Sequence, residues 1–194
     1  MKRPVILALL LLGVGAAPAH AGLGLTSVGV GAFGGLSVPV LQDVTASSFS
    51  PSDAFGKTGS QFGIRVPVAA IPVFTFEPFY SKSSYADRTE TLGGLSYTRD
   101  GFSGTAYGLN AILGHVDGSS VSFYPFAGIG HYKLTRTGSD DISDVGYDFG
   151  LGLGIQAVQK VSVQIRGEFT LVKTGDTSRK FTGATLGLNY SLLP

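Results

Sequence analysis

The sequence predicts an all-β fold, an eight-stranded antiparallel up-and-down transmembrane β-barrel. Apolar and polar residues alternate with a period of two in eight segments, and a tilted strand of roughly ten residues is enough to cross a bilayer. Glycine is abundant, at 29 of 194 residues, and charged residues make up only 14%, against about 25% in an ordinary soluble domain. The connectors between the segments alternate between long and short. Together these observations favour a barrel surrounded by lipid.

The N-terminus has the layout of a secretory signal peptide. The positive pair Lys2-Arg3 precedes an apolar segment at 5–17, which is too short to span a bilayer. A small-x-small cleavage motif ends at Ala21. We therefore expect residues 1–21 to be a cleaved signal peptide and residues 22–194 to form a single barrel domain. An N-terminal membrane anchor is the less favoured alternative. The layout is typical of bacterial export to the periplasm, the outer membrane or the medium.

One face of each predicted strand carries large apolar residues, and the other carries small or polar residues. In the first strand Val28 and Leu36 share the apolar face, opposite a face rich in glycine. The fifth strand is ambiguous, because His131 and Lys133 share the parity of Ile129. The last three strands alternate most regularly. The strands are predicted, in chain order, at residues 28–38, 61–68, 73–83, 103–114, 122–135, 145–156, 161–171 and 183–192.

The predicted connectors alternate in character along the chain. The first, third, fifth and seventh are long and polar, whereas the others are short. Long outer loops and short periplasmic turns are typical of outer-membrane barrels. The connectors are predicted, in chain order, at residues 41–58, 69–72, 84–102, 115–121, 136–144, 157–160 and 173–180.

Alternation alone does not say which face of the sheet points inward. The polar faces are too small and glycine-rich to solvate the outside of a soluble protein, and most charged residues fall in the connectors. We therefore expect the apolar faces to contact lipid and the polar faces to line a lumen with room only for side chains. The alternative is a soluble periplasmic lipocalin-like barrel, with its apolar faces turned inward around an apolar ligand.

Three segments resemble the small bacterial outer-membrane β-barrels of the OmpA/OmpX type. They are residues 124–132 (YPFAGIGHY), 163–169 (VQIRGEF) and 185–192 (TLGLNYSL). The resemblance covers the whole mature chain and implies a place in the outer membrane. The partners it implies are outer-membrane lipid, lipopolysaccharide and the barrel-insertion machinery. No peptidoglycan-binding domain is expected after the barrel. The family usually ends on an aromatic insertion signal, and this chain has Leu192 there instead.

Five charged residues fall on the predicted lumen faces. A buried charge without a partner is very costly, so these side chains are expected to pair and to plug the barrel. We expect Arg65 to lie beside Glu77, and Arg166 to pair with Glu168 or Asp148. The alternative is that the charges form a switchable gate or a thin ion path.

Two further patterns suggest ligands. Asp140, Asp141 and Asp144 lie in one connector, and loop carboxylates can hold Ca²⁺, but their spacing fits no EF-hand and a solvated loop is the favoured interpretation. Residues 29–34 match G-x-G-x-x-G, but a dinucleotide site would need a helix to follow. No helical period follows, so these glycines are expected to line a narrow lumen, and no cofactor is expected.

The histidines and tyrosines are not arranged as an active site. His115 lies near a predicted periplasmic turn and His131 on a strand, and neither belongs to a triad pattern. No enzymatic activity is expected. Most tyrosines lie near predicted strand ends and are expected to form a girdle at the membrane interface, with a carbohydrate platform as the alternative. These tyrosines are Tyr80, Tyr85, Tyr107, Tyr124, Tyr132, Tyr147 and Tyr190.

Composition narrows the function further. A net charge of +1 argues against a nucleic-acid partner, which needs a basic surface. The absence of cysteine excludes a disulfide scaffold, a Cys-ligated zinc site and an iron–sulfur centre. The sequence predicts a non-enzymatic structural or surface-interaction protein whose loops 41–58 and 84–102 meet extracellular partners. The alternative in the same fold is a narrow passive channel for small solutes.

Overall fold

The computed structural model describes residues 27–40, 57–71, 73–92, 95–99, 101–114, 121–136, 138, 140–175 and 177–193. The predicted signal peptide, residues 41–56 of the predicted loop at 41–58, and His115 lie outside these described residues. Among the described residues there is no helix that is both long enough and apolar enough to cross a membrane.

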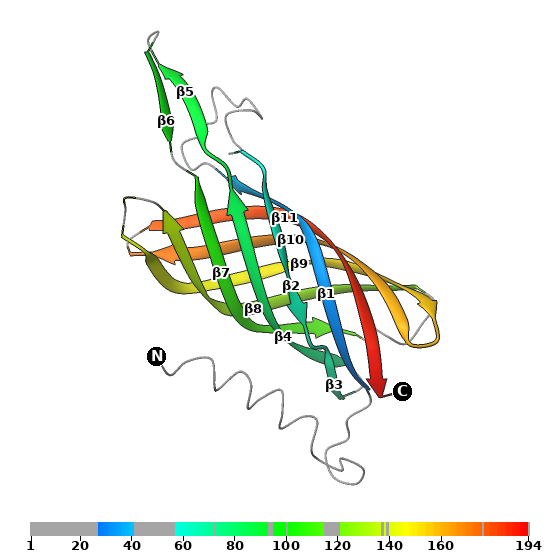
Figure 1. The fold of residues 1–194 in the computed structure, drawn as a ribbon. Helices are drawn as coiled ribbons and strands as arrows, with labels where there is room; N and C mark the ends of the chain where they lie inside the picture. The colour runs from blue at the N-terminus through cyan, green and yellow to red at the C-terminus, as the bar shows by residue number, and fades with distance from the viewer. Residues whose placement is uncertain are drawn as a thin grey trace, which may run out of the picture.

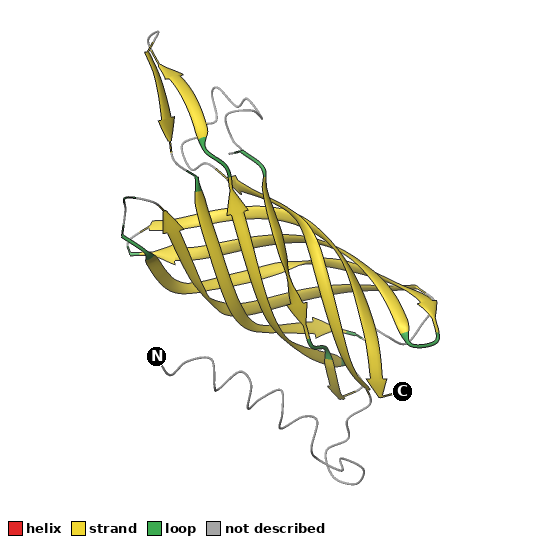
Figure 2. Cartoon of the chain, viewed as in Figure 1, coloured by secondary structure: helices red, strands yellow, loops and turns green. Residues whose placement is uncertain are grey.

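The described chain folds into one closed antiparallel barrel (Figures 1 and 2). Each barrel strand pairs with its neighbours along the chain, and the last strand pairs with the first to close the ring. The strands are β1 (Ser27–Val40), β2 (Gly59–Arg65), β3 (Val68–Ile71), β4 (Phe74–Tyr85), β5 (Arg88–Leu92), β6 (Leu95–Arg99), β7 (Phe102–Leu113), β8 (Val121–Arg136), β9 (Ile142–Val158), β10 (Val161–Thr174) and β11 (Thr177–Leu193).

Strands β2 and β3 share one position in the ring, because both lie between β1 and β4. The barrel therefore has the predicted eight positions. The interruption falls at Pro67, which has no N–H to donate to a ladder. The Pro67 carbonyl still accepts from Gly29 N at 2.8 Å, and Val66 N donates to Pro78 O at 2.9 Å. The predicted connector at 69–72 is wrong for the most part, because residues 68–71 form a strand.

Two of the predicted long loops also contain strands. The connector at 84–102 holds the β5–β6 hairpin, a separate two-stranded sheet that extends beyond the barrel wall (Figure 1). The connector at 173–180 is not a loop, because β10 and β11 stay paired as far as Thr174 and Thr177. Gly175 makes this tight turn with φ +62°, a conformation that glycine adopts without strain. Polar residues continue the strands here beyond the expected lipid layer.

The apolar faces point outward, as predicted, and the lipocalin-like alternative is wrong. On the outer surface Phe62, Leu186 and Leu188 are each 59% exposed. The lumen instead holds buried polar side chains. The sequence left open which face of β8 points outward. In the structure Phe123 and Ile129 face outward, while Tyr124 and Phe126 are buried inside.

Side chains fill the lumen in layers. Near the end of the barrel where β1 begins and β11 ends, Ile112, Tyr124 and Phe126 pack together. At the opposite end a second cluster closes the lumen, and we call it the upper cluster. Its buried members are Tyr85, Leu134, Val172 and Phe181, and Phe102, Tyr132 and Ile142 pack against it.

The prediction of a tyrosine girdle at the membrane interface is correct for some of the tyrosines and wrong for others. Tyr107, Tyr147 and Tyr190 are each about half exposed on the outer surface. Tyr85 and Tyr124 are buried in the lumen, and Tyr132 packs against the upper cluster. For those three residues the prediction of an interfacial position is wrong. The lumen supplies the polar partner that each buried phenol needs, so burial inside the barrel costs them little.

Candidate functional site

The central feature of the lumen is a buried ion pair between Arg166 on β10 and Glu77 on β4. Arg166 Nη1 donates to Glu77 Oε1 and Nη2 donates to Oε2, each at 2.6 Å. Two parallel bonds of this kind are the strongest arrangement of a guanidinium and a carboxylate. Both side chains are 0% exposed. The pair therefore blocks the lumen where it forms.

Neutral side chains make further hydrogen bonds to the Arg166 guanidinium and the Glu77 carboxylate. Arg166 Nε donates to Tyr124 Oη at 3.0 Å, and Nη2 also donates to Gln164 Oε1 at 2.9 Å. Asn110 Nδ2 donates to Glu77 Oε1 at 3.2 Å. A buried ion pair is tolerated only when such bonds replace the water it has lost.

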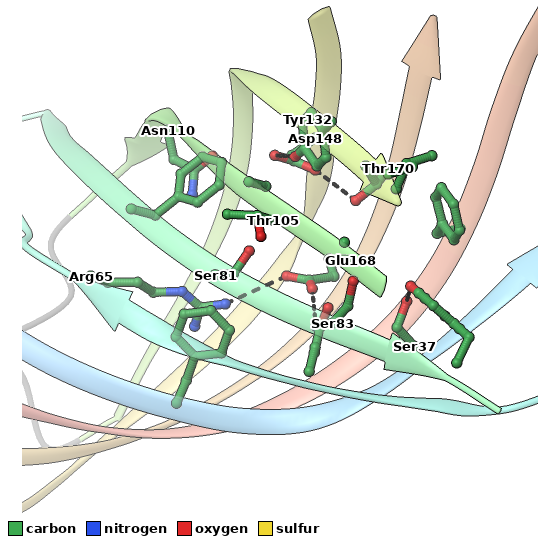
Figure 3. A pocket seen from close by; sticks show the side chains of 18 of the residues that line it. Ser37, Arg65, Ser81, Ser83, Thr105, Asn110, Tyr132, Asp148, Glu168 and Thr170 are labelled. Atoms are coloured by element: carbon green, nitrogen blue, oxygen red, sulfur yellow. Dashed lines mark hydrogen bonds and ion pairs between the residues drawn. The ribbon is translucent and has the colours of Figure 1, made fainter. Parts of the chain in front are cut away.

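Arg65 on β2 continues the charged layer. Its Nε lies 3.9 Å from Glu77 Oε1. Its Nη2 lies 3.5 Å from Glu168 Oε2, as Figure 3 shows. Nη2 also donates to Thr185 Oγ1 at 3.2 Å. The guanidinium carbon lies 3.7 Å from the centroid of the Phe33 ring, a cation–π contact. The four charges thus form one chain of alternating sign from Arg166 through Glu77 and Arg65 to Glu168.

Asp148 stands apart from this chain. It accepts from Thr170 Oγ1 at 2.6 Å and from the hydroxyl of Tyr132 (Figure 3). Within the described part of the chain no cation forms an ion pair with it. Two hydroxyl donors therefore stabilise this carboxylate, and they take the role that a positively charged side chain has for the other lumen acids.

The predicted pairing is wrong in one respect. Arg166 does not pair with Glu168 or Asp148; its acid is Glu77. Parity along a strand tells which residues share the lumen, but not which strand lies across from them. The neutral residues that complete the layer were not predicted from the sequence as partners of these charges, although each has lumen parity. They are Gln61, Asn110, Tyr124, Gln164 and Thr185.

A small cavity lies between the charged layer and the upper cluster. Its volume is about 60 Å³, and its walls include Arg65, Asp148 and Glu168 together with Tyr85 and Phe181. A water molecule needs roughly 10–15 Å³ of such space. The cavity therefore has room for a few waters beside polar groups.

The connector aspartates do not converge on a metal. Asp141 Oδ2 lies 2.6 Å from Lys133 Nζ, and the hydrogen bond from Lys133 lowers the pKa of the Asp141 carboxyl. Asp144 accepts from the backbone N of Val145 at 2.7 Å. In the described ranges no three His, Cys, Asp or Glu side chains are grouped to hold an ion. Asp140 lines a separate cavity at the mouth of the barrel.

His131 lies on the outer face of β8. Its Nε2 is 2.8 Å from Ser143 Oγ, and its ring centroid is 5.4 Å from that of Tyr107. No described carboxylate forms an ion pair with it. The arrangement is a polar contact above the apolar belt.

An apolar outer face, a closed sheet and a filled polar lumen define the class of transmembrane β-barrels. The chain belongs to the outer membrane protein beta-barrel domain family, whose model matches residues 7–191. This confirms the predicted family type, and it confirms the outer membrane as the location.

Solved structures with the same fold agree with this assignment. Neisserial surface protein A (NspA) has a TM-score of 0.63 at 14% identity, over 86% of this chain and 98% of that one. Ail of Yersinia pestis, in complex with the heparin analogue sucrose octasulfate, has a TM-score of 0.53 at 16% identity, over 86% and 99%. The N-terminal barrel of Pseudomonas aeruginosa OprF has a TM-score of 0.51 at 18% identity, over 86% and 99%. A comparison with curated proteins gives no match.

Proposed function

We propose that this protein is a non-enzymatic, non-conducting outer-membrane barrel that presents a surface-interaction site to the outside of the cell. The observation that carries the proposal is the filled lumen. Arg166 and Glu77 are 0% exposed and meet across the barrel, and Tyr124 beside them is 1% exposed. A rigid, closed barrel of this kind serves as a platform for the elements at its ends.

The upper cluster adds a second seal. Tyr85 stacks on Phe102 with ring centroids 4.2 Å apart, and Phe181 lies 5.7 Å from Tyr85. A solute would have to pass both this aromatic layer and the ion pair. A lumen of eight strands leaves little space around either.

We infer that the end where β1 begins and β11 ends faces the periplasm, as is usual for barrels with short turns there. The β5–β6 hairpin then stands on the extracellular side, where it extends past the barrel wall (Figure 1). In this proposal residues 1–21 direct export and are removed, and the mature chain contacts the insertion machinery, lipid and lipopolysaccharide. The structure of Ail with a heparin analogue is consistent with ligand binding by a barrel of this fold.

Bilayer recording tests the closed lumen. The mature protein, refolded and inserted into planar bilayers, is expected to give no defined conductance steps, whereas a large porin measured in the same way gives them. Regular steps in the purified protein would instead support the narrow passive channel.

Replacing the hairpin tests the surface role. A variant in which residues 88–99 are exchanged for a short Gly-Ser linker is expected to keep the closed barrel, since β5 and β6 pair only with each other in the described chain. It should still show the heat-dependent shift in gel mobility of a folded barrel. Bacteria that display it are expected to adhere less to glycan-coated surfaces than bacteria that display the parent protein. Equal adhesion by the two kinds of bacteria would show that the hairpin does not carry the surface interaction.

A further inference from the structure

The charges inside the lumen do not balance. Below the upper cluster, the described part of the lumen holds two arginines and three acids: Arg65, Arg166, Glu77, Asp148 and Glu168. When all five are ionised, two positive charges face three negative ones, a sum of −1. Arg166 pairs with Glu77 at 2.6 Å, and Arg65 lies 3.5 Å from Glu168. The excess negative charge therefore falls on Asp148.

The rest of the chain does not supply the missing positive charge. From residue 22 onward, the positions outside the described ranges include no lysine and no arginine. Arg136 and Arg179 line the separate cavity at the mouth of the barrel. Arg88 and Arg99 lie on the β5–β6 hairpin, which extends beyond the barrel wall (Figure 1). The hydroxyl donors to Asp148 stabilise its carboxylate, but they leave its charge in place.

Two carboxylates meet in the cavity of about 60 Å³ between the charged layer and the upper cluster, which we call the lumen cavity. Asp148 on β9 lies opposite Thr170 on β10. Glu168, two residues from Thr170, points to the same face and is therefore a diagonal neighbour of Asp148. Both acids line the lumen cavity, together with Ser81 and Ser83 (Figure 3). Like charges on neighbouring strands repel each other, so this arrangement favours a cation between them.

An unpaired oxygen in the same cavity points to the same conclusion. Asn110 lines the lumen cavity from β7 (Figure 3) and is 5% exposed. Its Nδ2 donates to Glu77 at 3.2 Å, which fixes the orientation of the amide because a carboxylate only accepts. Its Oδ1 is buried and has no hydrogen-bond partner among the described residues. Buried polar atoms are normally satisfied, and an amide oxygen is satisfied by a donor or a cation.

We propose that the lumen cavity binds one monovalent metal cation beside Asp148 and Glu168. Hard cations take oxygen ligands, and the cavity offers carboxylate, hydroxyl and amide oxygens. An ionised carboxylate has about four lone-pair sites. The two hydrogen bonds that each of these acids accepts therefore leave sites for a metal. One positive charge makes the lumen neutral, whereas a divalent ion would leave it positive. The inference does not depend on the proposed surface role.

The test measures stability against the cation at constant ionic strength. The mature protein is refolded into phospholipid vesicles in sodium, potassium or choline chloride, so that the ion is present when the barrel closes. Urea unfolding followed by circular dichroism then gives the ratio of folded to unfolded protein. Choline is too large for the lumen cavity. Sodium or potassium in place of choline is expected to raise this ratio about tenfold, as mass action gives at roughly ten times the dissociation constant.

The matched variants are Asp148→Asn, Glu168→Gln and the control Asp141→Asn. Each of the first two makes the charges of the lumen sum to zero, so the difference between choline and the metal salts is expected to disappear. If one of them does not fold, the other tests the same cavity. Asp141 is an exposed carboxylate that pairs with Lys133 outside the lumen. Its variant makes the same chemical change and is expected to keep the full dependence.

A direct count of the ion completes the experiment. Equilibrium dialysis of the refolded protein against radioactive sodium and rubidium is expected to show one ion per barrel in the parent protein and none in Asp148→Asn. Equal stability of the parent in all three salts would overturn the proposal, as would the same dependence in the parent and Asp148→Asn. Stability that ignores the salts but falls as the pH rises through neutrality would assign the missing charge to a proton, which also overturns it. None of these outcomes affects the hairpin test of the surface role.

Discussion

Replacing Arg166 by alanine is expected to lower the free energy of unfolding by about 3–5 kcal/mol, the usual cost of removing one partner of a buried ion pair. Glu77 would keep Asn110 at 3.2 Å and Arg65 at 3.9 Å, but it would lose both of its 2.6 Å bonds. The measurement is urea unfolding of the protein in phospholipid vesicles, followed by circular dichroism because the chain has no tryptophan.

The matched control removes both charges. The double variant Glu77→Leu with Arg166→Met is expected to recover most of the lost stability, since apolar residues of similar volume often replace a buried pair without net cost. A single alanine variant as stable as the parent protein would contradict the importance of the pair. A double variant no better than the single one would show that the loss comes from packing instead of the stranded charge.

Replacing Gly150 by alanine is expected to cost about 3 kcal/mol, at the upper end of overpacking penalties. A Cβ at this position on β9 would lie 2.1 Å from the carbonyl oxygen of Gly167 and 2.8 Å from Phe126 Cζ. The first contact is with backbone, so it can be relieved only by distorting the pairing of β9 with β10. The gel shift and urea unfolding both report this, and the closed fraction after refolding should fall.

Gly167→Ala on the neighbouring strand is the matched control. Nothing lies within 4 Å of a Cβ placed there, and its position on β10 is exposed on the outer face. Removing a glycine from a strand usually stabilises it by about 0.5–1 kcal/mol. Equal losses at the two positions would contradict the view that glycine is required only inside the lumen.

The faces of the strands were predictable because period two is a local property. The inward position of Arg65, Glu77 and Arg166 follows directly from it. The ends of the strands were not predictable in the same way. Residues such as Lys173 and Lys180 are typical of loops, but here they extend paired strands beyond the apolar belt, where water solvates the side chains while the ladder continues.

The partners inside the lumen depend on closure of the ring, which no local pattern reports. Tyr124 and Tyr132 illustrate this limit. A phenol suits both a membrane interface and a polar lumen, so the residue type does not decide between them. Arg166 and Tyr132 donate to Glu77 and Asp148, respectively, and only the three-dimensional ring makes those choices.

The Arg166–Glu77 pair also has a kinetic meaning. Around the ring, three strand positions separate β10 from β4 in either direction, so the pair is a brace across the full diameter. A flat sheet on the membrane cannot form it, because the strands from β4 to β10 must curl through half of the ring before the two side chains meet. Contacts that form last slow unfolding without hastening folding. The pair is therefore expected to leave the rate of insertion unchanged and to lower the rate at which the closed barrel unfolds.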